Sequence, residues 1–222
     1  MELKEIRKKE RQTENERRKE QMIDVAFICF SKKGMEAASI SDIAKEAAFG
    51  EATVYRYFSN KETLVLECGK KFWHMAADFF DAETNTEAFR KASGIQQVES
   101  MMRAACRFYE NERAAFRLIH DLDVFLLSHQ VQKEQLKEYE EAVDALRPYL
   151  CEAIEKGKED GSIANKADTL ELYYTITNGI FGLMQKQAAG SLLSTDLNVN
   201  EKRKIELFVE LLIAGVRDFY GK

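Results

Sequence analysis

The chain has 222 residues and a net charge of −5, with 33 Lys and Arg against 38 Asp and Glu. Hydrophobic residues make up 45% and the single proline is Pro148, which favours a soluble protein of long helices over a turn-rich β-fold. The longest apolar runs, such as 25–30, are far shorter than the ~20 residues of a membrane helix, and the charged N-terminus lacks the apolar region of a secretory signal. We therefore expect a cytoplasmic protein without a membrane partner.

The distribution of cysteine and histidine bears on the kinds of site that the chain can hold. The four cysteines are widely spaced and form no C-x-x-C pair, so we expect small apolar side chains in a reducing compartment. None of the three histidines lies in an H-E-x-x-H or E-x-x-H pattern, and no G-x-S-x-G or phosphate-binding glycine motif occurs. The sequence therefore predicts that the protein is not an enzyme and that it has no catalytic residue, no metal site and no cofactor.

The predicted elements begin with a charged extension at residues 1–13. Two interpretations stay open for its basic side chains, namely a solvated helix or a basic arm that touches phosphates. Residues 1–61 carry 13 Lys and Arg against 11 Asp and Glu, which leaves a net charge of −7 for the rest of the chain. This asymmetry favours an N-terminal part that approaches a polyanion, attached to an acidic body.

Helical spacing of apolar residues then predicts three helices, at 14–33, 40–47 and 51–58. Gly34 is placed to end the first helix, and Ser39 with an acid three residues later is placed to cap the second. A second S-x-x-E pattern at Ser59 opens a long helix that reaches about residue 81. Three helices with a tight turn between the second and the third form a helix-turn-helix unit.

The third helix has an inward side and an outward side. Val54 and Phe58 point inward, where they meet Ile43 and Ala44 of the second helix. Hydroxyl and guanidinium groups on the outward side are the donors that phosphate oxygens and base edges accept. A helix-turn-helix brings the start of its second helix into the major groove. We therefore predict that this unit binds double-stranded DNA.

Residues 17–64 resemble the DNA-binding domain of the TetR family of transcriptional regulators. The resemblance rests on three matches, which are Ile23…Ala26…Phe30…Gly34, Ser39-Ile40-x-Asp42-Ile43-Ala44 and Thr53-Val54-Tyr55-Arg56-Tyr57-Phe58-Ser59-Asn60-Lys61-Glu62-x-Leu64. It implies an all-α fold, with a three-helix helix-turn-helix DNA-binding domain at 14–61 and a helical effector-binding and dimerisation domain at 62–222.

The turn departs from the family pattern, because Ala48, Phe49 and Gly50 stand where a glycine, an aliphatic residue and a small polar residue are usual. Glycine is favoured at the first place because the turn needs a positive φ. Two solutions stay open. Ala48 adopts the positive φ at a cost of about 1–2 kcal/mol, or Gly50 takes up the bend and the turn is rebuilt.

The predicted DNA-binding residues are Ser39, Ser41, Glu51, Ala52, Thr53, Tyr55, Arg56, Tyr57 and Lys61. The resemblance implies that Tyr55 and Lys61 bind the phosphate backbone. Lys61 lies in the first turn of a helix, where the helix dipole disfavours a cation, and this misplaced charge agrees with a partner of opposite sign. Glu51 either stabilises the start of its helix or accepts a hydrogen bond from cytosine.

The rest of the chain predicts helices at 87–92, 94–110, 113–127, 131–158, 168–188 and 200–220. The last two are apolar nearly all round, so each has one side for the core and one for a partner. The resemblance implies that they form a four-helix bundle in a homodimer. The predicted interface residues are Ile180, Met184, Leu207, Leu211 and Ala214.

The resemblance also implies that the middle helices enclose a pocket for an apolar or amphipathic small molecule. Packing alone accounts for most of the bulky side chains there, and polar groups among them are candidate ligand contacts. The predicted pocket residues are Phe72, Met75, Phe79, Met101, Met102, Arg103, Phe116, His120, Tyr173, Thr177, Asn178 and Phe181.

The function predicted from the sequence is a sequence-specific DNA-binding transcriptional regulator. We expect a homodimeric repressor that a small-molecule effector releases from its operator. The alternative is a DNA-binding architectural factor or adaptor that has no effector.

Overall fold

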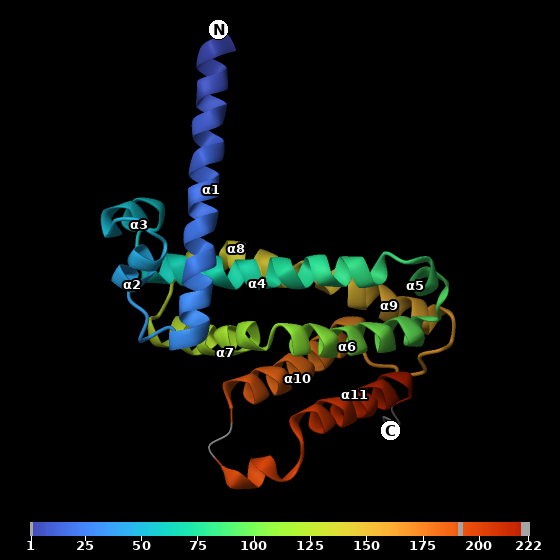
Figure 1. Cartoon of the computed structure of the whole chain (residues 1–222). Coiled ribbons are helices and arrows are strands. Elements are labelled where there is room, and N and C mark those ends of the chain that lie inside the picture. Colours follow the sequence, from blue (N-terminus) through green and yellow to red (C-terminus); the bar gives the residue numbers. More distant parts are fainter. Residues whose placement is uncertain (1, 191–192, 219–222) are drawn as a thin grey trace. The chain divides into compact units, whose positions relative to one another are not determined.

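The computed structural model describes residues 2–190 and 193–218, with side chains from residue 5 onward (Figure 1). In these ranges the chain forms α-helices and one short 3-10 helix, and it contains no β-strand, which confirms the predicted all-α class. The chain divides into two compact units. Unit 1 holds Met1–Lys71 and Asp121–Tyr139, and unit 2 holds Phe72–His120 and Glu140–Lys222.

Unit 1 consists of three complete helices, α1 to α3, and of parts of three further helices that continue into unit 2. Helix α1 packs on α2, and α2 packs on α3, around fully buried side chains such as Met22, Phe30 and Ile43. The tight connection between α2 and α3 is the predicted helix-turn-helix. The helices of this unit, whole or in part, are α1 (Glu2–Lys33), α2 (Ile40–Glu46), α3 (Glu51–Tyr57), α4 (Lys61–Thr84), α7 (Arg113–Ser128) and α8 (Lys133–Asp144).

Helix α1 begins at Glu2, whereas the sequence predicted a helix that begins at residue 14. The charged extension is therefore the first part of the same helix. Its Glu, Lys, Arg and Gln residues are strong helix formers, and no glycine or proline interrupts them. Glu14 adds ion pairs with Arg17 and Arg18 along the helix. The helix ends as predicted at Gly34, which has a φ of +82° and donates its N–H to the Phe30 carbonyl at 2.8 Å.

The turn between α2 and α3 takes the first of the two expected forms. Ala48 has a φ of +57°, in the left-handed region that favours glycine. Gly50 has an ordinary φ of −76° and precedes α3 as its N-terminal cap residue. The family's positive-φ position is therefore kept, and Ala48 fills it.

The two predicted capping patterns have different outcomes. Ser39 caps α2 as expected, because its hydroxyl accepts from the Asp42 N–H at 3.0 Å and Asp42 accepts from the Ser39 N–H at 3.2 Å. At the start of α4, the capping side chain is Asn60 instead of Ser59. Its Oδ1 atom accepts from the Thr63 N–H at 2.8 Å, since α4 begins one residue later than the S-x-x-E pattern suggests.

Unit 2 holds the remaining helices together with parts of α4, α7 and α8. Helix α6 packs on α9 and α11, and α10 packs on the same two helices. The approach of α6 to α9 is so close that a Cβ atom at Gly94 would lie 2.0 Å from the Gly157 nitrogen, so only glycine fits there. The additional elements are α5 (Glu87–Lys91), α6 (Gly94–Asn111), α9 (Arg147–Glu159), α10 (Thr169–Ala189), the 3-10 helix η1 (Ser194–Asn198) and α11 (Glu201–Arg217).

The long helix that the sequence predicted at 131–158 is in fact two helices. Helix α8 ends at Asp144, and α9 begins at Arg147 with Pro148 in its first turn. Proline lacks an N–H and clashes with the carbonyl four residues earlier in a continuous helix, whereas it is well tolerated where a helix starts. The apolar periodicity runs through this break and concealed it.

The last described helix is α11. Helix α11 ends at Arg217, and residues 219 and 220 of the predicted helix lie outside the described residues. Among the described residues, no helix combines the length and the apolar character that crossing a membrane requires.

Candidate nucleic-acid interface and effector cavity

The outward side of α3 is held in place by a buried inward side. Val54 and Phe58 are buried, as are Ile43 and Ala44 of α2, so the predicted packing of the helix-turn-helix is confirmed. On the opposite side, the predicted DNA-binding residues are solvent-facing to different degrees. Exposed are Ser39, Ser41, Glu51, Ala52, Tyr55 and Arg56, and partly exposed are Thr53, Tyr57 and Lys61.

Tyr57 contributes to folding as well as to this surface. Its hydroxyl donates to Asn15 Oδ1 at 3.1 Å, which ties the end of α3 to α1. The Arg56 guanidinium lies over the Tyr57 ring, 5.5 Å from its centroid, and holds that ring from the solvent side. Sequence reasoning missed Asn15, because its partner lies 42 residues away in the chain.

Lys61 already has two partners within unit 1. Its Nζ atom donates to the Glu36 carbonyl at 3.3 Å and lies 5.6 Å from the centroid of the Phe125 ring. The lysine is therefore placed by a carbonyl and a ring, which explains a cation in the first turn of α4 without DNA. A phosphate contact by Lys61 would require that these contacts are given up.

The start of α2 is fixed electrostatically as well as by its cap. Hydrogen bonds from the Ser39 backbone and side chain, followed by the nearby Lys33, lower the pKa of the Asp42 carboxyl below its usual value. Asp42 therefore stays ionised and keeps Ser39 in the capping position. Ser39 serves folding first, and Ser41 is the freer of the two hydroxyls.

A cavity lies inside unit 2, between α4, α6, α9 and α10. It leaves about 40 Å³ for the centres of water-sized spheres. Five of the twelve predicted pocket residues line it: Met101, Met102, Tyr173, Thr177 and Phe181. The sequence did not predict the other lining residues as pocket residues, and it assigned Ile180 to the dimer interface; they are Phe80, Ala105, Leu146, Leu150, Ile176 and Ile180.

The other seven predicted pocket residues do not line this cavity, namely Phe72, Met75, Phe79, Arg103, Phe116, His120 and Asn178. Phe72 and Phe116 are fully buried and meet edge to face with 5.2 Å between ring centroids, so they belong to the solid core. Arg103 is exposed and donates to Glu99 on the same helix. Asn178 is exposed, because other residues of α10, such as Thr177 and Phe181, face the cavity.

The cavity wall is mostly apolar, and its hydroxyl groups come from Tyr173 and Thr177. Burial raises the pKa of Tyr173 to about 12, so this hydroxyl stays protonated at neutral pH. The Thr177 hydroxyl donates to the Tyr173 carbonyl at 2.8 Å within α10. Such a wall suits an apolar ligand group and offers few polar groups to orient it.

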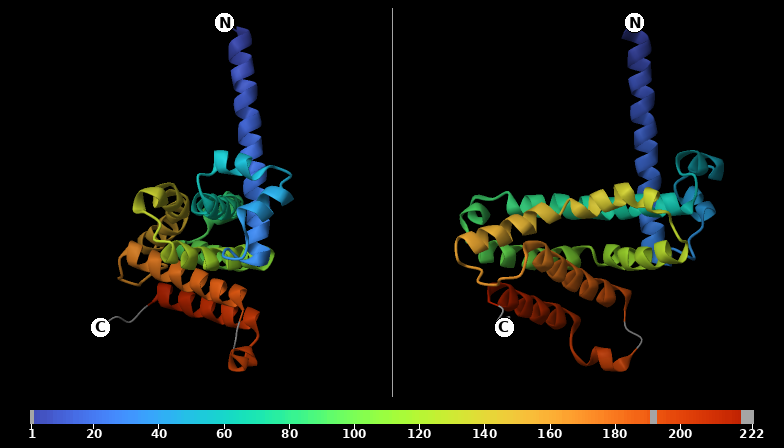
Figure 2. Two further views of the ribbon diagram at one scale, coloured as in Figure 1. Left: turned by 90° about the vertical axis from the view of Figure 1, so that its left-hand side faces the viewer. Right: turned by 180° about the vertical axis from the view of Figure 1, so that it is seen from behind.

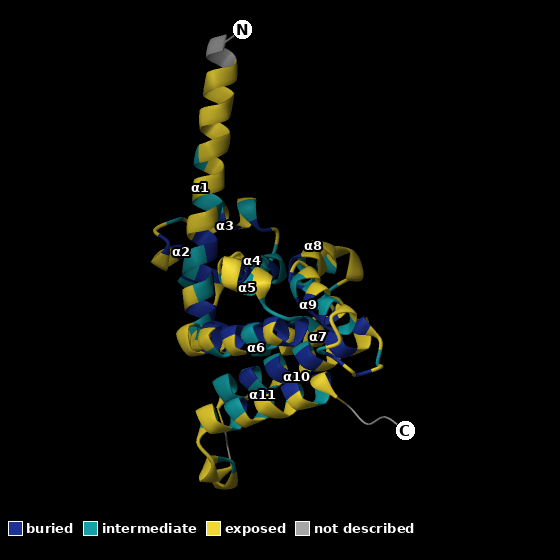
Figure 3. Ribbon diagram, turned by 90° about the vertical axis from the view of Figure 1, so that its right-hand side faces the viewer, coloured by how far each residue is buried: buried dark blue, intermediate teal, exposed yellow. Residues whose placement is uncertain are grey.

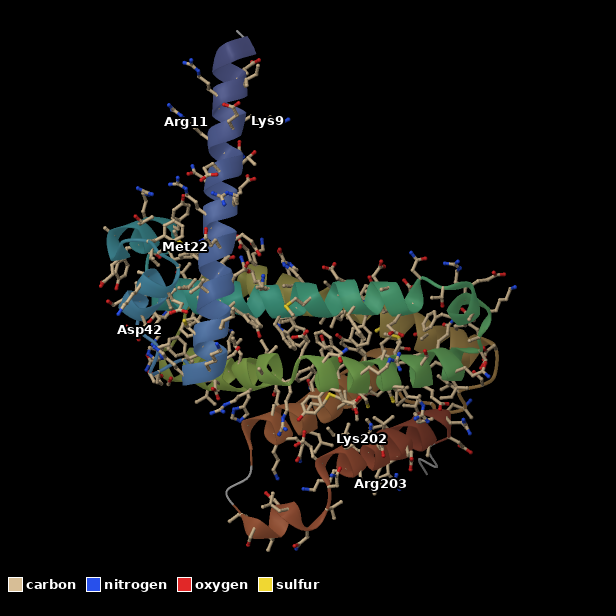
Figure 4. All side chains as sticks on the ribbon, viewed as in Figure 1. Lys9, Arg11, Met22, Asp42, Lys202 and Arg203 are labelled. Atoms are coloured by element: carbon tan, nitrogen blue, oxygen red, sulfur yellow. The ribbon has the colours of Figure 1, made fainter. Side chains whose placement is uncertain are left out.

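A second, larger hollow of about 380 Å³ lies between α6 and α11. Its charged walls are paired internally, since Arg113 lies 2.8 Å from Glu201 and Lys202 lies 2.9 Å from Glu110. Lys202 lies near the start of α11 (Figure 4). The other two arginines of the lining, Arg103 and Arg107, pair with Glu99 and Glu83.

One side of α10 and α11 is apolar and uncovered. Leu211 is 63% exposed, and Leu207 and Ala214 are exposed on the same side of α11. The predicted interface residues Ile180 and Met184 are 2% and 0% exposed, because they pack inside unit 2. This corrects the sequence expectation, since buried side chains have nothing to offer to a partner. Leu170 and Tyr174, which the sequence did not single out, are exposed on α10 instead.

Comparison with known proteins identifies the same helix-turn-helix segment. Residues 22–68 match the profile of the bacterial regulatory proteins of the tetR family, and this stretch contains α2, α3 and their tight turn. Residues 22–68 therefore form an N-terminal domain of the tetR family type. Within the described residues, no group of three or more His, Cys, Asp and Glu side chains is arranged to hold a metal ion.

Two curated relatives differ in how much of this chain they cover. The HTH-type transcriptional repressor KstR2 of Rhodococcus jostii is 23% identical over 159 residues, which are 68% of this chain and 70% of that protein. The uncharacterized HTH-type transcriptional regulator YvdT of Bacillus subtilis is 44% identical, over 46 residues that make up 21% of this chain and 24% of YvdT. The higher identity is therefore confined to a short segment.

Solved structures share the fold of this chain over most of its length. The regulator FadR from Bacillus subtilis, in complex with stearoyl-CoA, has a TM-score of 0.64 and 19% identity, covering 88% of this chain and 98% of that one. KstR2 of Mycobacterium tuberculosis has a TM-score of 0.61 and 18% identity, covering 90% and 95%. At such low identity the likeness establishes the fold, and the ligand of FadR is a property of FadR.

Proposed function

We propose that this TetR-family regulator is a sequence-specific, homodimeric repressor that acts in the cytoplasm. The observation that carries the proposal is the outer side of α3. Thr53, Tyr55 and Arg56 present hydrogen-bond donors there, and none of the three makes a side-chain hydrogen bond to another described residue. Base edges and phosphate oxygens accept such donors, and a helix-turn-helix brings its second helix to the major groove.

In this proposal residues 14–61 bind the operator, and residues 62–222 bind the effector and a second copy of the chain. The compact unit 1 is larger than the DNA-binding part, because residues 62–71 and 121–139 also pack in it. Helices α4, α7 and α8 each contribute residues to both units. A ligand that moves one of these helices in unit 2 therefore acts on an element that also belongs to unit 1.

The uncovered apolar side of α10 and α11 supports a homodimer. In the single chain, apolar side chains of both helices are exposed to water. They are Leu207, Leu211 and Ala214 on α11, with Leu170 and Tyr174 on α10. Apolar patches of this kind mark protein interfaces. Two copies joined here would carry two α3 helices, as two half-sites one helical turn apart require.

The cavity in unit 2 supports a small-molecule effector that is apolar or amphipathic. In its present form it has room for about three water molecules, so a larger ligand must push α6, α9 and α10 apart. Met101 and Met102 are flexible enough to rearrange around such a ligand. Ligand entry and helix displacement are therefore coupled, which is what release from an operator needs.

The test begins with selection of bound duplexes from a random DNA pool by the full-length protein. We expect one enriched sequence made of two related half-sites, which the protein binds in fluorescence anisotropy. A thermal-shift screen with acyl-CoA thioesters and apolar compounds follows, and stearoyl-CoA is its first probe. We expect at least one compound to raise the melting temperature and to weaken operator binding.

Two results would change the proposal. A pool from which no sequence is enriched would contradict a sequence-specific regulator. Enrichment of an operator without any stabilising compound would favour the alternative, which is a DNA-binding architectural factor or adaptor that has no effector.

A further inference from the structure

The first half of α1 extends beyond the helix-turn-helix. Both views of Figure 2 show this helix continuing past α2 and α3 toward the N-terminus. Figure 3 shows that this part is exposed, apart from short patches near residues 14 and 18. Residues 5–13 are exposed without exception, so no part of the described chain covers them. We call residues 5–14 the α1 arm.

One sector of the α1 arm carries three basic side chains and no acidic one. At about 100° per residue, Arg7, Lys8 and Arg11 fall within about 100° of one another around the helix axis. Acidic residues border this sector on both edges: Glu5 and Glu16 lie about 60° and 80° beyond Lys8, and Glu10 and Glu14 lie about 60° and 20° beyond Arg7. In Figure 4, Arg11 points toward the side on which α3 lies and Lys9 points the opposite way, so Lys9 lies outside this sector. We call Arg7, Lys8 and Arg11 the basic side of the arm.

The basic side faces in the same direction as the DNA-reading helix. Asn15, which lies between Lys8 and Arg11 in angle around α1, accepts the hydrogen bond from Tyr57 of α3. Lys19, one turn further along, lies over the Phe58 ring at 6.0 Å. The contacts of α3 with α1 therefore fix which side of α1 continues past the recognition helix.

The three cations of the basic side have free charge to offer. None of them makes an ion pair with any acidic side chain that the structure describes. By contrast, Glu14 accepts hydrogen bonds from Arg17 and Arg18, which lower its pKa to about 2, and Lys19 lies 3.1 Å from Glu67. Along the described part of α1, ion pairing thus begins at Glu14, the last residue of the arm.

We propose that the basic side of the α1 arm is a second DNA contact, which binds phosphates next to the groove that α3 reads. The inference rests on the proposed DNA-binding function and extends its surface. At 1.5 Å per residue, Arg11 and Arg7 lie about 6 and 12 Å beyond Asn15 along α1. The major groove is about 12 Å wide and is bordered by the two phosphate backbones, so these side chains lie at the distance of a bordering backbone.

The contact adds affinity without reading bases. Arginine and lysine on phosphates release counterions and carry no sequence information directly. The arm therefore lengthens the stretch of DNA that the protein needs, and it makes binding to that longer stretch more sensitive to salt.

The experiment compares two single substitutions on the same helix, Arg11→Ala and the matched control Lys9→Ala. Each removes one exposed cation, and alanine preserves helix propensity. Each variant is measured by anisotropy between low and moderate salt, on the duplex selected by the wild-type protein. One duplex is trimmed to the selected sequence, and the other carries arbitrary flanking base pairs on both sides.

We expect the wild-type protein to bind the long duplex more tightly than the trimmed one. On the long duplex, Arg11→Ala makes the negative slope of log K against log salt shallower by about one unit per subunit. On the trimmed duplex the change in slope is smaller. Lys9→Ala behaves as the wild type on both. The double substitution Arg7→Ala and Arg11→Ala removes most of the preference for the long duplex.

Equal slopes for Arg11→Ala and Lys9→Ala would overturn the inference, and so would an Arg11→Ala effect that is the same on both duplexes. A change in sedimentation of Arg11→Ala in place of a change in slope would make the arm an interface between copies, and would also overturn it. These outcomes leave the proposed function intact if the wild-type protein still binds its selected duplex. A wild-type protein that selects no sequence contradicts both proposals.

Discussion

The outer side of α3 and the cavity wall in unit 2 differ in what their side chains do for the folded state. Tyr55 and Arg56 are exposed and contribute little buried surface, whereas Ile176 and Ile180 are nearly fully buried. Side chains of the first kind are available for a partner at no cost to folding. Those of the second kind serve folding and the ligand at once, so a change there alters stability together with any response to an effector.

The largest expected loss of operator binding comes from a third region, the uncovered side of α11. Leu211→Glu places a charge in the proposed dimer interface, so we expect monomers that lose tight operator binding. Two linked α3 helices must reach grooves roughly 34–36 Å apart, which a single copy cannot do. Because Leu211 is exposed in the single chain, the stability of the monomer should change little.

Sedimentation and operator binding measure this effect. Leu197→Glu is the matched control, because Leu197 is 73% exposed and lies on η1 instead of α11. A Leu211→Glu monomer that binds the operator as the wild type does would remove the dimer from the account.

The cavity wall is expected to show the next largest effect. Ile176→Ala removes a side chain that is 2% exposed and enlarges an existing cavity. Substitutions of this kind lower the free energy of unfolding by about 2–5 kcal/mol, and chemical denaturation measures the loss. A loss well below 1 kcal/mol would mean that the wall is loosely packed, and it would weaken the contrast with α3.

The outer side of α3 should behave in the opposite way. Arg56→Ala is expected to weaken operator binding by about 1–3 kcal/mol and to relax preference at one base pair if Arg56 reads a base. The free energy of unfolding should stay nearly unchanged, because the guanidinium is exposed. Arg90→Ala, an exposed arginine of unit 2, is the control for lost charge. Equal losses of operator affinity for the two variants would exclude a specific role for Arg56.

The smallest effect concerns the turn that sets the direction of α3. Ala48→Gly relieves a φ of +57°, so we expect the protein to gain at most about 1 kcal/mol in the free energy of unfolding. The added freedom of glycine in the unfolded chain offsets part of the relief. A loss of stability on denaturation would contradict strain at this position.

The parts of the fold that the sequence predicted depend on short-range signals. The Ser39 capping box, the end of α1 at Gly34 and the inward side of α3 each involve residues a few positions apart, and each is confirmed. Pro148 shows the limit of periodicity, because the apolar pattern continues through the break between α8 and α9 although the proline itself marked it.

The parts that the sequence missed depend on contacts between distant segments. The hydrogen bond of Tyr57 to Asn15 joins residues that no local pattern relates. The cavity is similar, since a void forms where several helices fail to fill the space between them. Phe72 and Leu150 have the same apolar character in the sequence, but only Leu150 lines the cavity. Which DNA-binding residues touch DNA stays a prediction.

The central claim, that unit 2 binds an effector at the expense of operator binding, is tested most directly by calorimetry. The ligand is the compound from the acyl-CoA and apolar panel that raises the melting temperature most, titrated into the protein with and without saturating operator duplex. Coupling between two sites is reciprocal, so the account predicts that operator weakens the ligand by the same factor by which the ligand weakens operator, roughly 5–150-fold for a coupling of about 1–3 kcal/mol. Equal ligand affinities in the two titrations would contradict the account.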